Sequence, residues 1–308
     1  MSASRPGSKA SRKTIVILGG GAAFGAHQAG ALEYLYNSGV RPDVIIGSSV
    51  GIVNALLYAA GGCELMRSSW HNLNSLQVLF GPSLRHNPMV GNSLMSMSRM
   101  VQWIENTVDF EQVFRGDPRL EFVLLNLSDG HTYLKGNRTE ENADDFRTVS
   151  HIGYRIPILF PPIKFKGDYW CDGGFVWNIP LEHALEIGGT DIYILSVILD
   201  HLPYQATFPT LAHVSYRMLE VLWATAGNSS RLRARVVAGK YHGARVHDIR
   251  PSEYLGANPI SILLTYPSKA KRLYELGMKD AETAMAAKPA GESVEEAVEH
   301  GSGGVEVT

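Results

Sequence analysis

The segment that decides the fold is VIIGSSVGIVNALLYAAGG, residues 44–62. Its apolar start, VIIG (44–47), predicts a buried strand, and residues 50–60 predict a helix that ends at Gly61 and Gly62. The small residues between the two allow a sharp turn from strand to helix. Because such a turn can hold one side chain exposed, the segment predicts a site where the strand ends.

Strand and helix patterns alternate along the rest of the chain. TIVIL (14–18) and residues 119–128 and 191–199 have the composition of short buried strands, whereas residues 26–39 and 179–188 have helical patterns. Alternating strands and helices predict an α/β fold, with a mainly parallel sheet covered on both faces by helices. Sites in such sheets lie at the carboxyl ends of strands, which is where the turn described above falls.

Composition narrows the function classes. The 308 residues are 45% hydrophobic and 19% charged, an ordinary mixture for a globular protein with a sizeable core. The formal net charge of -2 creates no overall field that would attract nucleic acid or an anionic membrane. Only two cysteines occur, Cys63 and Cys171, which excludes a disulfide framework and a cysteine-based zinc cluster. We therefore expect no nucleic-acid partner and a reducing, cytoplasmic location.

The two ends of the chain differ from its middle. Residues 1–13 carry basic side chains but no apolar run of signal-peptide length, which predicts a disordered basic arm. Residues 288–308 contain Glu, Gly and Val without large apolar periodicity, which predicts a disordered acidic tail. Residues 14–287 are expected to form the folded domain. The longest apolar runs, such as 192–199, have the length of strands, so no membrane-spanning helix is expected.

The turn between strand and helix, Gly47-Ser48-Ser49-Val50-Gly51, matches the G-x-S-x-G nucleophile elbow. Glycines two positions before and after the central serine permit close strand–helix packing at a strained turn. The amino end of the helix stabilises negative charge near the serine oxygen. The pattern occurs often by chance in glycine-rich chains, but its place between a strand and a helix makes Ser49 the candidate nucleophile. Ser48 is its neighbour.

A second element, LGGGAAFGAHQAG (18–30), is a glycine-rich turn from strand to helix. Its backbone N–H groups suit an anion, either a bound phosphate or an oxyanion that forms during a reaction. The dinucleotide fingerprint G-x-G-x-x-G fails because Phe24 occupies its last position. The P-loop fails because Ala26 and His27 stand where Lys and Ser/Thr belong. A turn with packing value alone is the remaining alternative.

A nucleophilic serine needs a base, and the sequence offers two schemes. The α/β-hydrolase order requires an acid and then a histidine after the serine, and none of the candidate histidines has a distinctive setting. These candidates are His183, His201, His213, His242 and His247. The other scheme places an aspartate directly against the serine. Its candidate is Asp172 in YWCDGGFVWNIP (169–180), where Gly173 and Gly174 allow a tight turn beside the carboxylate.

Three ordered motifs resemble the patatin-like phospholipases: GGGAAFG, GSSVG followed by IVNALL, and DGG. IPILFPPI (156–163) and the spacing of Asn178 after DGG agree with that family, and the resemblance is clearest over residues 14–200. It implies a three-layer patatin-like fold and a catalytic domain over 14–287. There are departures. Many members carry Arg where this chain has Phe24, and SHIGYR (150–155) replaces a run of small residues.

The resemblance implies a mechanism for each motif. Asp172 would accept the proton of Ser49, whose oxygen attacks an ester carbonyl. N–H groups of Gly19, Gly20 and Gly21 would form the oxyanion hole. Gly47, Gly51, Gly173 and Gly174 are the elbow and motif glycines. No metal or organic cofactor is expected, and the substrate is expected to be a lipid or another acyl ester.

Two further segments bear on the substrate. Met89, Met95, Met97 and Met100 lie close together in the sequence and suit either a lid over variable acyl chains or core packing, which we favour. Residues 210–240 form a helical pattern with a basic end that suits either an anionic membrane surface or a solvated helix face. Peripheral membrane contact is therefore left open.

Three hypotheses of function follow. The leading one is a serine acyl hydrolase of the phospholipase A or lipid esterase type. The second is an acyltransferase or thioesterase that uses the same acyl-enzyme. The third is a non-catalytic lipid-binding module, against which the intact serine, aspartate and glycine motifs argue.

Overall fold

The computed structural model describes residues 12–74, 93, 95–199, 201–238, 244–256 and 265–287. The predicted acidic tail and most of the predicted basic arm lie outside the described residues. Arg12 and Lys13, the last two residues of that arm, are described. The Arg12 Nε donates to the Asp191 carboxylate at 2.6 Å, and the Lys13 Nζ donates to a backbone carbonyl at 2.7 Å. Both residues are thereby attached to the domain.

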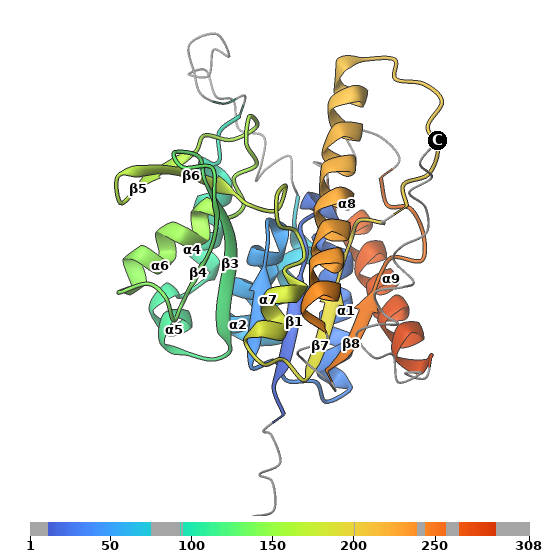
Figure 1. Ribbon diagram of the computed structural model, residues 1–308, viewed down its shortest axis with the longest axis horizontal. Helices are drawn as coiled ribbons and strands as arrows, with labels where there is room; N and C mark the ends of the chain where they lie inside the picture. The colour runs from blue at the N-terminus through green and yellow to red at the C-terminus, as the bar shows by residue number, and fades with distance from the viewer. Residues whose placement is uncertain are drawn as a thin grey trace, which may run out of the picture.

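Within the described residues, eight strands form one sheet (Figure 1). Its order is β5-β6-β3-β2-β1-β7-β8, and β4 pairs with β3 outside this path. The strands β1, β2, β3, β7 and β8 run parallel, whereas β4, β5 and β6 pair antiparallel. The bounds are β1 (Thr14–Leu18), β2 (Val44–Gly47), β3 (Arg119–Asn126), β4 (Thr132–Gly136), β5 (Ile163–Phe165), β6 (Asp168–Asp172), β7 (Asp191–Leu195) and β8 (Arg245–Ile249). The expectation of a mainly parallel sheet is confirmed.

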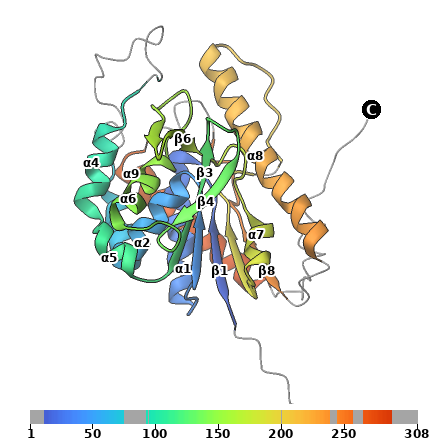
Figure 2. The same ribbon diagram turned by 60° about the vertical axis from the view of Figure 1, so that its left-hand side comes forward.

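Helices cover both faces of this sheet, which gives three layers (Figure 2). Along β1, Val16 and Leu18 pack into the core shared with α1, α2 and α9, whereas Ile15 and Ile17 pack into the core shared with α7 and α8. The described helices are η1 (Ala22–Phe24), α1 (Gly25–Asn37), α2 (Val50–Asn72), α4 (Ser98–Thr107), α5 (Phe110–Arg115), α6 (Ala143–Ile152), α7 (Leu181–Glu186), α8 (Leu211–Ala238) and α9 (Pro267–Ala286). The predicted three-layer α/β fold is confirmed.

The helix after the serine turn is longer than predicted. It was expected to end at Gly61 and Gly62, and both residues do leave the helical conformation, with φ of -158° and 66°. The chain then resumes helical geometry as far as Asn72, because Met66 and Trp70 on the second part are buried against the core. The two glycines therefore kink α2 rather than end it.

The carboxyl-terminal part of the described chain completes the sheet and one layer. β8 pairs in parallel with β7, and α9 packs closely on α1. A Cβ added to Gly30 of α1 would lie 1.9 Å from the Tyr274 backbone oxygen, and one added to Gly277 of α9 would lie 1.9 Å from the His27 backbone oxygen. Glycine at both positions is what lets the two helix backbones approach.

Candidate active site

Ser49 occupies a strained turn at the carboxyl end of β2. Its φ of 52° and ψ of -124° lie outside the regions that residues with a Cβ commonly adopt. The turn is held by the Ser48 N–H, which donates to the Leu18 carbonyl at 3.0 Å. A Cβ at Gly51 would lie 2.1 Å from that same carbonyl oxygen, so glycine is required for α2 to approach β1. A strained serine with tight supporting glycines is the geometry that the G-x-S-x-G pattern predicts.

The glycine loop after β1 lies against this serine. A Cβ at Gly20 would come within 2.9 Å of the Ser49 Cβ. The Gly19 N–H donates to the Leu195 carbonyl at 3.2 Å, and the Gly20 N–H donates to the Asn178 side-chain oxygen at 2.6 Å. Two of the three N–H groups predicted for an oxyanion hole therefore already have acceptors within the protein.

The N–H groups of Gly21 and Val50 have no acceptor among the described residues. Gly21 was among the predicted donors, whereas Val50 was not singled out from the sequence. The signal for Val50 was present, because it begins the helix directly after Ser49 and the first N–H groups of a helix have no partner within it. The residue after the nucleophile supplies one oxyanion donor in many serine elbows. These two N–H groups are the candidate donors that this geometry leaves available.

Asp172 ends β6 and is fully buried beside Ser49. Its Oδ1 accepts the Gly174 N–H at 2.8 Å, whereas its Oδ2 has no hydrogen-bond partner among the described residues. Burial raises the pKa of Asp172 to about 7, and the Gly174 N–H and the nearby Ser49 hydroxyl oppose that rise. The serine is thus close enough to affect the carboxyl group without a hydrogen bond of standard geometry to Oδ2. A buried carboxylate oxygen without a partner can accept a proton.

Asn178 joins the three motifs. Its side-chain oxygen accepts the Gly20 N–H at 2.6 Å and the Ser48 hydroxyl at 2.8 Å, and its backbone oxygen is a second acceptor for that hydroxyl at 3.0 Å. The sequence indicated only that the spacing of Asn178 after DGG was familiar. The structure gives it a contact with both the glycine loop and the serine turn.

The candidate histidines lie in other settings. His183 bonds to Glu121 at 2.8 Å, His213 bonds to Thr210, and His247 stacks on Tyr193. His242 lies outside the described residues. Among the described residues that line the cavity around Ser49, none is a histidine. The group beside Ser49 is a carboxyl group.

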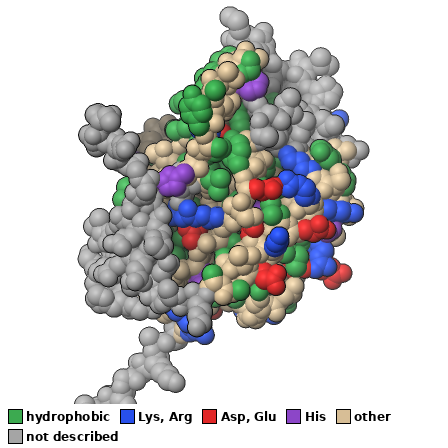
Figure 3. Space-filling view, turned by 90° about the vertical axis from the view of Figure 1, so that its right-hand side faces the viewer, with side chains coloured by type: hydrophobic (Ala, Val, Ile, Leu, Met, Phe, Trp, Pro, Cys, Tyr) green, Lys and Arg blue, Asp and Glu red, His purple; other side chains and the backbone are tan. Residues whose placement is uncertain are grey.

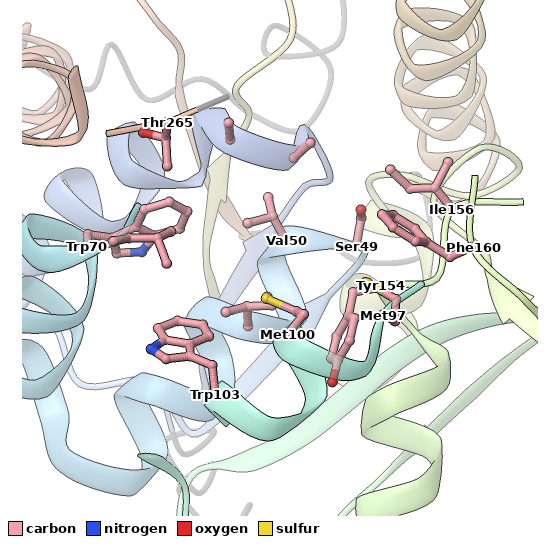
Figure 4. A pocket seen from close by; sticks show the side chains of 14 residues that line it. Ser49, Val50, Trp70, Met97, Met100, Trp103, Tyr154, Ile156, Phe160 and Thr265 are labelled. Atoms are coloured by element: carbon pink, nitrogen blue, oxygen red, sulfur yellow. The ribbon is translucent and has the colours of Figure 1, made fainter. Parts of the chain in front are cut away.

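An apolar cavity, partly open to solvent, extends from Ser49. Figure 4 shows Ser49 with Phe160 at one end and Trp70 and Trp103 at the other, with Met100 between them. Its walls are aromatic and aliphatic side chains from α2, α4 and the segment after α6. A cavity with such an apolar lining suits a hydrocarbon chain.

The methionines predicted as lid or core have different positions. Met97 and Met100 line the cavity, and Met97 is also buried in the core. Met95 is half-buried against the core, and Met89 lies outside the described residues. Two of these three described methionines therefore contact the space next to Ser49.

The described residues offer little to hold a metal. Within the described ranges, no group of three or more His, Cys, Asp and Glu side chains lies together in a metal-binding arrangement.

Phe24 stands where many members of the family that the sequence resembles carry Arg. Its ring is buried, and the Lys269 ammonium lies 5.5 Å from the ring centroid.

These features define a class: an α/β protein with a serine elbow at the carboxyl edge of a parallel sheet, beside a glycine loop and a buried carboxyl group. The model of the family described as "Patatin-like phospholipase" matches residues 15–185, more than half of the chain. The chain therefore belongs to the patatin-like phospholipase family, and the predicted resemblance is confirmed. The expectation of an enzyme that hydrolyses lipid carboxylic esters agrees with this family.

Individual relatives are distant. Lysophospholipase nte1 of Aspergillus terreus is 24% identical over 194 residues, which cover 60% of this chain and 12% of that protein. A patatin-like phospholipase domain-containing protein of Caenorhabditis elegans is 26% identical over 180 residues, or 56% of this chain and 13% of that protein. The match spans about an eighth of the length of these relatives. The match with the structure of VipD from Legionella pneumophila covers 90% of this chain and 67% of the VipD chain, with a TM-score of 0.45 and 13% sequence identity.

Proposed function

We propose that this chain is a serine acyl hydrolase that cleaves carboxylic ester bonds of lipids, as a phospholipase A or lipid esterase does. Ser49 is the nucleophile and Asp172 is the base. One observation carries the proposal: a buried carboxylate oxygen without a partner lies beside a strained serine at the end of an apolar cavity. Family membership supports the same class of reaction.

In the first step, Asp172 accepts the proton of the Ser49 hydroxyl as the serine oxygen bonds to the carbonyl carbon of the ester. The negative charge moves to the carbonyl oxygen, where the N–H groups of Gly21 and Val50 stabilise it. Each such donor typically contributes roughly 3 kcal/mol to lowering the barrier. The alcohol leaves with the proton that Asp172 held, and an acyl-serine remains.

In the second step, water attacks the acyl-serine carbonyl and Asp172 accepts its proton. Collapse of the tetrahedral intermediate releases the fatty acid, and the proton returns to Ser49. The hydrocarbon part of the acyl group lies in the apolar cavity throughout, between Ser49 and the two tryptophans at its far end. No metal or organic cofactor takes part in this scheme.

Intact-mass analysis after reaction with a long-chain alkyl fluorophosphonate tests the proposal. The native chain should gain one adduct, which Ser49→Ala should abolish and Asp172→Asn should slow. Ser48→Ala controls for the neighbouring hydroxyl and should keep the adduct. Asp168→Asn controls for loss of a carboxylate from the same strand, β6, and should leave the labelling rate within about twofold. An adduct that persists in Ser49→Ala would overturn the assignment of the nucleophile.

Product analysis, added to this labelling experiment, separates the alternatives. An acyltransferase or thioesterase would form the same adduct, but it would transfer the acyl group to an added alcohol, or would prefer a thioester, when products are analysed with competing acceptors. The absence of any adduct on the native chain, with and without membranes, would favour a non-catalytic lipid-binding module.

We also propose a cytoplasmic location with peripheral contact to a lipid bilayer. Cys63 and Cys171 are both free thiols, as a reducing compartment requires. Among the helices of the described part, none is long and apolar enough to cross a bilayer. The proposed contact is therefore a surface contact near the cavity that contains Ser49.

The amino-terminal half of α8 supports contact with a bilayer better than the basic carboxyl-terminal end of the helix does. Arg231 and Arg233 at the basic end form ion pairs with Asp248 and Glu182, respectively, at 2.9 Å and 2.6 Å. At the other end, hydrophobic side chains spaced along one helix face are exposed: Leu211, Val214, Met218, Val221 and Leu222. Figure 3 shows hydrophobic side chains gathered where this end projects. In Figure 1 the helix begins at the end of the molecule toward which β1 runs.

Flotation with liposomes of zwitterionic lipid tests the contact. The native chain should float, and Leu211→Glu combined with Met218→Glu should remain at the bottom of the gradient. Leu232→Glu provides a matched control, because Leu232 is an exposed leucine near the opposite end of the same helix. Flotation that is equal in all three proteins, or absent in the native chain, would contradict the proposed contact.

A further inference from the structure

A chain of buried side-chain hydrogen bonds connects the cavity wall with the glycine loop. The Trp70 indole N–H donates to the Asn54 side-chain oxygen at 2.7 Å. The Asn54 amide nitrogen donates to the Gln28 side-chain oxygen and to the Gly25 carbonyl, both at 2.9 Å. The Gln28 amide nitrogen donates to the Gly19 carbonyl, again at 2.9 Å. All three side chains are almost completely buried.

The direction of these bonds is fixed by chemistry. An indole nitrogen can only donate, so Trp70 requires the oxygen of the Asn54 amide to face it. The Asn54 nitrogen must then face Gln28, which in turn directs the Gln28 nitrogen at backbone carbonyl oxygens. Every hydrogen of both amide groups has an acceptor, because the Gln28 nitrogen also donates to the Leu195 carbonyl at 2.9 Å. A buried network that is fully satisfied holds one arrangement.

This arrangement acts on the loop beside Ser49. Gln28 holds the carbonyl of Gly19, while Asn178 holds the N–H of Gly20 at 2.6 Å. Those two groups belong to the same peptide unit, so its plane is fixed from both sides. The following N–H, that of Gly21, is the candidate oxyanion donor, and its orientation depends on that plane.

We propose that Trp70, Asn54 and Gln28 are a positioning relay that sets the oxyanion donor of the glycine loop, and that the wall of the acyl cavity is its outer end. The Trp70 ring lines the cavity (Figure 4), so an acyl chain packs against the residue that orients the relay. The inference rests on the proposed function. None of the three residues touches the reacting atoms.

Trp70→Phe tests the relay because it keeps an aromatic side chain in the wall and removes the indole N–H, together with part of the ring volume; the control must therefore lose the same atoms. Trp170→Phe is the matched control. Trp170 is similarly buried, its N–H donates to the Phe165 carbonyl at 3.1 Å on β5, and it does not line the cavity that contains Ser49. Both variants lose one buried hydrogen bond, so both should show a lower Tm. Only the relay variant should lose catalytic rate.

The measurement is kcat and KM for a p-nitrophenyl acyl ester, with active sites counted by fluorophosphonate titration. Trp70→Phe should lower kcat per active site by about 10- to 100-fold, since a displacement of the order of 1 Å can cost about 100-fold. Gln28→Met, which removes both amide donors at similar size, should lower kcat per active site by a similar factor with KM within about twofold, because Gln28 does not line the cavity. Trp170→Phe should retain the native kcat per site.

The outcomes separate the two levels of inference. Native kcat per active site in Trp70→Phe and Gln28→Met, at a lowered Tm, would show that the network is only structural and would overturn the relay alone. Equal loss of kcat in Trp170→Phe would also overturn it. If the native chain has neither a Ser49 adduct nor turnover, the proposed function fails and the relay fails with it.

Discussion

The backbone of Ser49 is strained, and its side chain makes no capping hydrogen bond to the helix that would offset the strain. A residue with a Cβ at a φ of 52° and a ψ of -124° is disfavoured by of the order of 1–3 kcal/mol, whereas glycine adopts this conformation freely. Ser49→Gly and Ser49→Ala both remove the hydroxyl group, but only the first relieves the strain. We expect Ser49→Gly to be the more stable by about 1 kcal/mol in urea unfolding, after the greater freedom of unfolded glycine is included. Equal midpoints would show that the strain is no larger than the entropy cost of glycine, about 0.4–1 kcal/mol.

The carboxyl group of Asp172 sets the expected pH dependence of the reaction. Its pKa is raised to about 7, first of all by burial, and only the ionised form can accept the serine proton. The labelling rate with a fluorophosphonate should therefore rise as pH increases from 5, by up to about tenfold per unit, and level off above about 7. A fluorophosphonate has no group that titrates in this range, so the profile reports the protein. A flat profile between pH 5 and pH 9 would contradict the role of Asp172 as base.

At the scale of one helix, α4 forms the cavity wall that faces Ser49. Met97 just before it and Met100 and Trp103 on it recur every third position, which places them along one side of the helix. Trp103 lies at the far end of the cavity in Figure 4. Trp103→Ala should lengthen the cavity and raise the preference for longer acyl chains. Since each additional buried methylene contributes about 0.8 kcal/mol, two of them should change the ratio of kcat/KM values by about tenfold or more.

A series of p-nitrophenyl esters from four to sixteen carbons measures this preference. Met95→Leu is the control, because Met95 packs half-buried against the core and does not line the cavity. It should retain the native profile. If Trp103→Ala also retains it, the acyl chain lies elsewhere.

The elements were predictable from sequence where a local pattern determines them. The strand VIIG, the turn and the start of α2 follow from composition within a few residues. The continuation of α2 past Gly62 does not, because it depends on the burial of Trp70 by distant parts of the chain. The contacts of Asn178 and Gln28 have the same origin: Asn178 is 158 positions from Gly20, and no periodicity encodes such a pairing. The sequence therefore indicated the candidate nucleophile and acid but not the amides around the glycine loop.

At the scale of the whole molecule, alternation of strands and helices predicted the layers but not the order of the strands. β3 pairs with β6 in antiparallel fashion, which brings Asp172 opposite Leu124 and toward the turn that follows β2. Pairing between such distant strands depends on the complete core rather than on either strand. For the same reason, residues beyond 200 showed only helical and strand-like stretches, although β8 and α9 belong to the same sheet and core.

Removal of α9 should therefore prevent folding of the whole domain. Truncation after residue 256 would expose the face of α1 that α9 covers and would lose the buried side chains of Leu273 and Tyr274, each contributing about 1.5–3 kcal/mol. It would also leave Glu33, which is buried and accepts a hydrogen bond from the Tyr274 hydroxyl, without that partner. These losses approach the 5–15 kcal/mol by which a typical domain is stable. Circular dichroism should show no cooperative thermal transition for the chain truncated after residue 256. A chain truncated after residue 287, which keeps α9 entire, should preserve the native Tm and activity. A cooperative transition without α9 would instead assign the folded domain to the part of the chain that precedes it.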